Sequence, residues 1–296
     1  MTALTGLSAF PITPADAAGV VDAAGLRRLV GRLAAAGVDS VGLLGSTGTY
    51  AYLTRAERRR ALEAALEEAA GRVPVLVGVG ALRTDDAIRL AGDARAAGAA
   101  AGLLAPVSYT PLTDDEVYAH VRAVAEGSGL PLCIYNNPST THFDVSPALL
   151  GRLSRIEGVV AVKNPAPPPD RVAAHLAAAR AAAGPGFALG YSVDWHAAEA
   201  LLAGGEAWYS VAAGLWPGPC RAIVEAVRRG DAGEARRRDA ALEPLWALFR
   251  AHSSLRVVHA AAEIMGLCRA VPPRPILPLA APARAEVEAV VRTLEA

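Results

Sequence analysis

The apolar and polar positions of the chain repeat as one unit: a short apolar run, a loop rich in polar residues, glycine or proline, and an alanine-rich stretch with helical periodicity. The apolar runs predict eight strands, at residues 4–10, 40–44, 75–79, 101–107, 132–135, 159–162, 187–189 and 208–211. The stretches that follow them predict helices near residues 23–36, 54–70, 84–97, 113–126, 146–154, 169–183, 194–203 and 216–229. Four hydroxyl residues are the predicted N-caps of such helices: Thr54, Thr84, Thr113 and Ser146.

Eight units of nearly constant length predict a closed parallel (β/α)8 barrel, the TIM barrel of the α/β class. A doubly wound sheet would instead need a glycine-rich phosphate-binding turn after its first strand, and residues 10–14 read FPITP. Three further helices are predicted near residues 232–250, 255–267 and 282–295. We therefore expect a barrel domain of residues 1–230 and a helical C-terminal extension, residues 231–296, packed on it. In such barrels the active site lies at the C-terminal ends of the strands.

The charge balance indicates neither a nucleic acid nor a membrane as a partner, because 29 basic and 29 acidic residues cancel and no long run of one sign occurs. The arginines at positions 58–60 sit in a predicted helix and are expected to form a solvated face. Glycines and prolines interrupt the uncharged stretch of residues 96–113, which argues against a membrane span. Three widely spaced cysteines and an N-terminus without a signal-like pattern favour a reducing, cytoplasmic location.

Lysine occurs only once in the chain, at position 163, whereas arginine is frequent. An arginine can serve in any surface ion pair, but it cannot lose its proton in a protein, and a lysine can. Lys163 follows the apolar run of residues 159–162, where burial disfavours the ammonium and lowers its pKa. A neutral amine there can attack a ketone and form an imine, which acts as an electron sink when a carbon–carbon bond is made or broken. A lysine retained by chance on the surface is the alternative.

Two other predicted strand ends carry hydroxyl groups. The second strand is followed by the turn GSTG, residues 45–48, in which Ser46 and Thr47 could hold a carboxylate or relay a proton. The fifth strand ends in YNNP, residues 135–138, where Tyr135 could shuttle the protons that imine formation requires. Taken singly, the first motif favours a plain turn, and the second slightly favours a core tyrosine with a satisfied hydroxyl.

The ordered set of these segments resembles the dihydrodipicolinate synthase / N-acetylneuraminate lyase family, over at least residues 1–230. The matching segments are GSTG at 45–48, YNNP at 135–138, VVAVKNP at 159–165, Gly190 and WYSV at 208–211. The resemblance implies a class I lyase that needs neither a metal nor a cofactor and acts on pyruvate or a related 2-oxo acid. It also implies a homotetramer built from two dimers.

The resemblance implies a role for each matching residue. Lys163 corresponds to the Schiff-base lysine, Tyr135 to the general acid/base, and Ser46 to the hydroxyl that joins the tyrosine in a proton relay. The expected substrate contacts are Thr47 and Gly48, whose turn binds the pyruvate carboxylate with its backbone amides, and Gly190 and Tyr209, which line the keto-acid pocket.

Three departures from the family pattern narrow the expected function. Thr140 stands where dihydrodipicolinate synthases have an arginine that holds the carboxylate of the aldehyde substrate, so aspartate semialdehyde is disfavoured. Thr49 stands where the family motif usually has a glutamate. Ser108 aligns with a tyrosine that is donated across the dimer interface, and Tyr109 beside it is the candidate substitute. His142 is expected to be a surface loop residue, with a contact to the second substrate as the alternative.

Four functions remain in competition. The first is a Schiff-base lyase or aldolase for a 2-oxo acid, and the second is a 4-hydroxy-tetrahydrodipicolinate synthase with altered substrate contacts. The third, from another class, is a non-catalytic sensor that binds keto acids. A metal-dependent aldolase is disfavoured because the six histidines do not gather at strand ends as metal ligands would.

Overall fold

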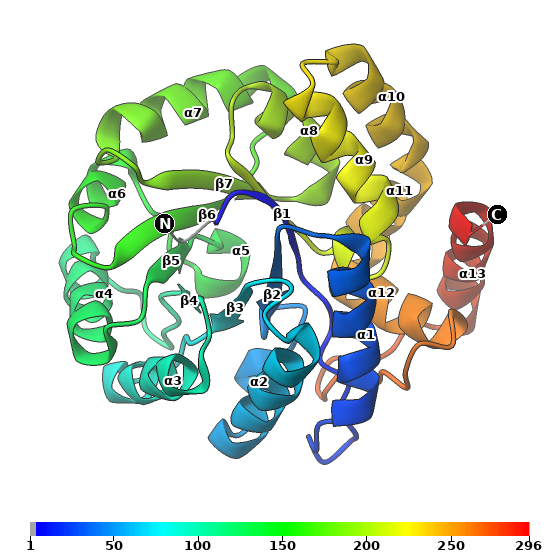
Figure 1. The fold of residues 1–296 in the computed structure, drawn as a ribbon, viewed down its shortest axis with the longest axis horizontal. Coiled ribbons are helices and arrows are strands. Elements are labelled where there is room, and N and C mark those ends of the chain that lie inside the picture. Colours follow the sequence, from blue (N-terminus) through cyan, green and yellow to red (C-terminus); the bar gives the residue numbers. More distant parts are fainter. Residues whose placement is uncertain (1–3, 296) are drawn as a thin grey trace.

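The computed structural model describes residues 4–295 and contains a closed barrel in which each strand pairs in parallel with its neighbours in chain order (Figure 1). The ring closes because β1 pairs with β8 as well as with β2. The strands are β1 (Gly6–Ala9), β2 (Ser40–Leu43), β3 (Val75–Gly78), β4 (Ala101–Leu104), β5 (Leu132–Tyr135), β6 (Val159–Pro165), β7 (Ala188–Ser192) and β8 (Ala207–Ser210). The predicted (β/α)8 fold is confirmed.

Helices surround the barrel, and the last ones form the C-terminal extension (Figure 1). The helices of the barrel are α1 (Ala23–Ala36), α2 (Arg55–Ala69), α3 (Thr84–Ala97), α4 (Asp114–Ser128), α5 (Pro138–Thr141), α6 (Pro147–Leu153), α7 (Pro169–Ala182), α8 (Asp194–Leu202) and α9 (Pro217–Arg228). The extension consists of α10 (Ala232–Ala241), α11 (Glu243–His252), α12 (Ser254–Ile264) and α13 (Ala281–Glu295). Two single 3-10 turns, η1 (Tyr50–Tyr52) and η2 (Ala212–Gly214), follow strands β2 and β8.

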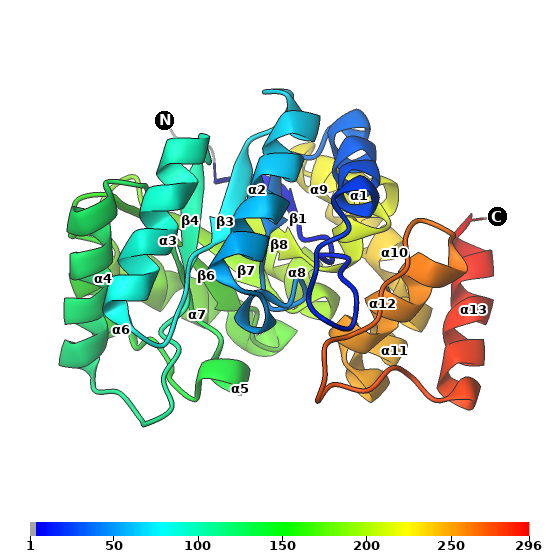
Figure 2. The same cartoon turned by 90° about the horizontal axis from the view of Figure 1, so that it is seen from below.

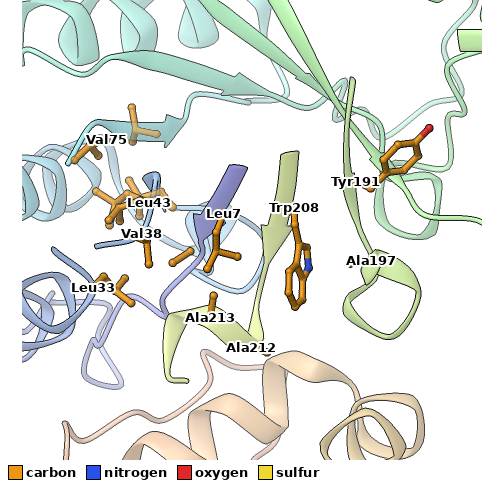
Figure 3. Packing of buried hydrophobic residues seen from close by; sticks show 14 of the residues in the cluster. Leu7, Leu33, Val38, Leu43, Val75, Tyr191, Ala197, Trp208, Ala212 and Ala213 are labelled. Atoms are coloured by element: carbon orange, nitrogen blue, oxygen red, sulfur yellow. The ribbon is translucent and has the colours of Figure 1, made fainter. Parts of the chain in front are cut away.

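Alternation along the strands sorts the core into two layers. Apolar side chains that point outward pack against the helices, and Leu7, Val38 and Leu43 lie close together in this layer (Figure 3). Inward-pointing side chains fill the barrel, among them Leu76, Cys133 and Tyr209. The interior is therefore a packed core rather than a pore.

Two predicted helix boundaries are wrong for identifiable reasons. The single helix expected near residues 232–250 is divided into α10 and α11, because Pro244 lies in the first turn of α11, where its missing N–H is tolerated. Thr84 is not an N-cap: it is the first residue of α3, and its hydroxyl hydrogen-bonds His120 Nδ1 at 2.9 Å. The other three predicted caps do accept backbone N–H bonds, namely Thr54, Thr113 and Ser146.

The arginine cluster at positions 58–60 is not uniformly solvated as expected. Arg59 and Arg60 are exposed, but Arg58 is buried. Its guanidinium donates to the carbonyls of Gly78 and Gly80 at 2.7 and 3.1 Å, so it satisfies backbone acceptors where β3 ends. Burial lowers the pKa of Arg58 to about 10. The helical pattern could not predict this, because those carbonyls belong to another unit of the barrel.

The C-terminal extension packs along one side of the barrel, with α10 against α9 and α8 (Figure 1). The predicted domain boundary at residue 230 falls between α9 and α10. The division into a barrel domain and an extension stays a prediction. Within residues 4–295, every helix is too short or too polar to span a membrane.

Candidate active site

Lys163 lies near the end of β6, in register with Tyr135 on β5 and with Gly190 on β7. The side chain is 3% exposed. Its Nζ lies 3.9 Å from the ring centroid of Phe10 and 4.2 Å from that of Tyr135. Burial among these rings lowers the pKa of Lys163 from 10.5 to about 8, against the opposing influence of Cys133 and Asp194.

Phe10 was not predicted as a site residue, although it forms one wall beside the amine. Its ring fits because Gly42 on β2 has no side chain: a Cβ there would lie 2.2 Å from two ring atoms of Phe10. The signal in the sequence was only the aromatic residue at the end of the first apolar run. Its contact with Lys163 depends on closure of the barrel, which brings the distant ends of β1 and β6 to one mouth.

The hydroxyl of Tyr135 has two hydrogen-bond partners. It lies 2.8 Å from Ser46 Oγ, and it accepts a bond from Asn137 Nδ2 at 3.0 Å. Burial raises the pKa of Tyr135 to about 12, while the bond with Ser46 acts in the opposite direction. Tyr135 is therefore protonated at neutral pH, as a group that donates a proton must be. Sequence reasoning paired Ser46 with Tyr135 but overlooked Asn137.

The turn after β2 holds Ser46 and Thr47 at the mouth. Leu44 and Thr49, on either side of them, have φ of 54° and 55°, a region that costs free energy for residues other than glycine. The turn closes with a bond from the N–H of Thr49 to the carbonyl of Ser46 at 3.0 Å. Thr47 is 6% exposed and lines the same cavity as Lys163. Strain of this kind is common at functional sites, where packing around the loop maintains it.

Gly48, an expected substrate contact, lies in the tightly packed part of this turn. A Cβ at this position would lie 3.0 Å from Leu44 Cα and from Thr13 Oγ1. The residue is buried and does not line the cavity around Lys163. Its direct effect is to let the turn fold closely onto its neighbours.

A cavity of about 250 Å³ opens above Lys163, and hydroxyl and amide groups dominate its polar wall. These groups are Ser46, Thr47, Tyr135, Asn137, Ser139, Thr140, Ser192, Ser253 and Ser254. The only charged residues that line it, among residues 4–295, are Lys163 and Asp194. A second hollow of about 270 Å³ shares Ser46, Tyr135, Thr140 and Leu255 with it.

Asp194, at the start of α8, was not predicted as a site residue. It lines the cavity and accepts hydrogen bonds from residues on and just after β8. Its carboxylate accepts bonds from Trp208 Nε1 at 2.8 Å and from the N–H groups of Val211 and Ala212 at 3.1 and 3.3 Å. Burial raises its pKa, and these bonds oppose that shift. Trp195 beside it also lines the cavity. Trp208 itself lies in the outer core layer (Figure 3).

Gly190 and Tyr209 lie below the amine, inside the barrel, rather than along the cavity wall. The ring of Tyr209 is 1% exposed, and its centroid lies 5.9 Å from Lys163 Nζ. A Cβ on Gly190 would lie 2.3 Å from Cε2 of that ring. The tyrosine hydroxyl accepts a weak bond from Cys133 Sγ at 3.5 Å. The pair therefore supports Lys163 from beneath.

Tyr109 is not brought to Lys163 within one chain. Its side chain is 96% exposed, and neighbouring Ser108 lines a separate surface hollow. His142 is also exposed, as expected of a loop residue. Within a single chain, therefore, this loop brings no second tyrosine to the hydrogen-bonded pair of Ser46 and Tyr135.

The C-terminal extension contributes three residues to the site, Ser253, Ser254 and Leu255, at the junction of α11 and α12. Ser253 has φ of 71°, and Val193, which also lines the cavity, has φ of 66°, so two residues of its wall have strained backbone. No motif in the sequence marked this junction. Its place at the mouth results from packing of the extension against the barrel, which helical periodicity does not specify.

Comparison with known proteins agrees with this fold. Residues 3–294 match the model of the Dihydrodipicolinate synthetase family. A 4-hydroxy-tetrahydrodipicolinate synthase of Methylococcus capsulatus is 36% identical over 280 residues, which cover 95% of each chain. The crystal structure of a dihydrodipicolinate synthase from Agrobacterium tumefaciens has a TM-score of 0.97 and 55% identity over 99% of both chains. One from Aquifex aeolicus has a TM-score of 0.90 and 27% identity over 98% of both chains.

A (β/α)8 barrel with a buried lysine and a hydroxyl network at the mouth is the framework of a class I barrel lyase. The chain belongs to the dihydrodipicolinate synthetase family and is a lyase of that family.

Proposed function

We propose that the protein forms a Schiff base between Lys163 and pyruvate or a related 2-oxo acid, and cleaves, condenses or dehydrates such compounds. The observation that carries the proposal is the burial of the single lysine beside Tyr135 and Phe10, which lowers its pKa to about 8. At pH 7 about one lysine in ten would then be neutral, compared with about one in 3,000 at the ordinary pKa. The nucleophile is thus available without a separate base.

The neighbouring groups support the remaining steps. Lys163 Nζ adds to the ketone carbon, and the carbinolamine must gain a proton on its oxygen before water leaves. The Tyr135 hydroxyl, 2.8 Å from Ser46 Oγ, is the group proposed to move protons in this step. Thr47 and the backbone amides of its turn are the proposed contacts of the substrate carboxylate. The iminium then accepts the electron pair of the bond that breaks next to it.

The second substrate, or the aldehyde product, is proposed not to be aspartate semialdehyde. The position of the family arginine is occupied by Thr140, and the residues that line the cavity include no arginine. A carboxylate on the acceptor would therefore lack a bidentate partner. The relatives named 4-hydroxy-tetrahydrodipicolinate synthase keep that activity as the second candidate.

The assembly is proposed to be a cytoplasmic homotetramer made of two dimers. The exposed side chains of Tyr109 and Leu82, 96% and 69% exposed, support an interface on this face of the barrel. In such a dimer Tyr109 would be offered to the partner subunit. Sedimentation of the purified protein tests the tetramer.

Reductive trapping tests the proposed imine. Incubation with pyruvate and sodium borohydride is expected to add one reduced adduct, on Lys163, seen by peptide mass spectrometry. In the variant Lys163→Arg the adduct should disappear, because arginine keeps its proton. A matched control is the double variant Lys163→Arg, Arg59→Lys, which keeps one lysine, at exposed Arg59 on α2. An adduct on that surface lysine, or none in the wild type, contradicts the proposal.

A keto-acid sensor is distinguished by turnover. If pyruvate is trapped on Lys163 but no 2-oxo acid of a broad panel is cleaved, condensed or dehydrated, the sensor replaces the enzyme.

A further inference from the structure

The side chain of Asn137 joins the hydroxyl of Tyr135 to the rim of the cavity. Its Nδ2 lies 3.0 Å from Tyr135 Oη and 2.7 Å from Thr140 Oγ1. Its Oδ1 lies 2.9 Å from Ser139 Oγ. Asn137 is half-buried between these groups and lines the cavity above Lys163. The proposed reaction assigns no role to this side chain.

The surrounding bonds define which end of the amide faces Tyr135. The hydroxyl of Thr140 gives its own proton to the backbone carbonyl of Asn137, at 3.3 Å. It can therefore only accept from the side chain, which requires the NH₂ group on that side. The hydroxyl of Ser139 donates to Oδ1 on the other side. The contacts with Thr140 and Ser139 therefore require the same orientation of the amide, in which the NH₂ group of Asn137 donates to the Tyr135 oxygen.

A donor at this position determines where the proton of Tyr135 can point. A phenol has one proton, and it cannot share that proton with an NH₂ group that is itself donating. The Tyr135 proton is therefore directed toward Ser46 Oγ or into the cavity. The same bond stabilises the phenolate that remains after the proton has been given away.

We infer that Asn137 is a positioning residue that acts through Tyr135 and keeps its hydroxyl aimed at the reacting atoms. The inference rests on the proposed imine function. Since Ser139 and Thr140 hold the amide and are themselves exposed at the rim, a substrate that contacts these two hydroxyls is coupled through Asn137 to the general acid/base.

Exchange of the methyl protons of pyruvate in D₂O, followed by proton NMR, measures this role without any second substrate. Each turnover moves one proton from C3 of the iminium to a base, giving the enamine, and returns a deuteron. Asn137→Ala should slow exchange about 10- to 100-fold, the range of a misplaced general acid/base. Asn137→Asp, of the same shape, should slow it at least as much, because a carboxylate accepts the tyrosine proton. Borohydride trapping at equilibrium should remain complete in both variants.

Two further readouts separate positioning from a general loosening of the site. The pH midpoint for labelling of Lys163 should stay near 8 in Asn137→Ala, whereas a hydrated, loosened cavity would move it toward 10.5. In a Tyr135→Phe background, Asn137→Ala should change exchange less than about twofold, because coupled residues are not additive. Equal losses in both backgrounds, or no loss in either Asn137 variant, would overturn the inference. Absence of exchange and trapping in the wild type would instead overturn the proposed function.

Discussion

The two halves of the candidate site are built in different ways. The inner half, around Lys163 and Tyr135, rests on paired strands, and its side chains are 3% and 7% exposed. The outer half is formed by the four-residue helix α5 and by the junction of α11 and α12, at the end of the barrel where α5 lies (Figure 2). There Ser139, Thr140 and Ser253 are exposed.

The difference shows which part of the reaction each half can determine. Strand register fixes the lysine and the tyrosine relative to each other, and dense packing makes their environment dry enough to lower one pKa and raise the other. The rim offers hydroxyl groups on short elements, whose substitution changes contacts without disturbing the barrel. Chemistry is thus expected to tolerate little change at the inner half, and substrate choice to depend on the outer half.

The exclusion of water from the inner half can be tested by the pH dependence of chemical labelling at Lys163. The change in labelling rate is the largest effect expected. An acylating reagent reacts only with neutral amines, and the single lysine makes the labelled peptide unambiguous. Since burial lowers the pKa of Lys163 to about 8, the labelling rate should rise about 50- to 100-fold between pH 6 and pH 9 and then level off. A labelling rate that keeps rising to pH 10 would mean that water reaches Lys163 and that its pKa is not lowered. The reagent's rate with free lysine supplies the control.

The inner half was also the part that the sequence predicted best. Lys163 and Tyr135 end consecutive apolar runs, and consecutive strands are neighbours in a barrel, so their contact follows from order along the chain. Ser46 could be joined to them because all strand ends meet at one mouth. Phe10 and Asp194 were missed, because their contacts, with Lys163 and with Trp208, depend on side-chain packing between different units of the barrel.

The rim was poorly predicted for a physical reason. Asn137 and Thr140 are brought together by the single turn of α5, which is too short to show helical periodicity. Ser253 reaches the mouth through packing of the extension, more than 200 residues after the turn that carries Ser46. Tyr109 has a role only if a second chain supplies its surroundings. Local pattern therefore located the residues of the inner half better than those of the rim.

Packing beneath Lys163 gives a test of intermediate size. Gly190→Ala places a methyl group 2.3 Å from the Tyr209 ring, which should lower the free energy of unfolding in urea by about 1–3 kcal/mol. Adding Tyr209→Leu should restore only part of that loss, because it removes the ring but leaves Ala207 Cβ 2.8 Å from the new methyl group. At the rim, the matched change Ser139→Ala should stay within about 0.5 kcal/mol. Equal losses at Gly190 and Ser139 would remove the distinction between a rigid inner half and a permissive rim.

The smallest expected effect concerns the choice of the second substrate. Thr140→Arg restores a planar cation at the exposed rim, where it can hold a carboxylate through two parallel bonds. Condensation of pyruvate with aspartate semialdehyde should increase about 10-fold, an effect on the order of one charge-assisted bond. Proton exchange of pyruvate alone should fall about two- to threefold, because Asn137 loses its bond to Thr140. Thr140→Lys supplies the charge without the planar fork, so its gain should be smaller. Equal gains with lysine and arginine would mean that the rim attracts the acceptor only by its charge, and no gain with either would mean that the acceptor does not approach α5.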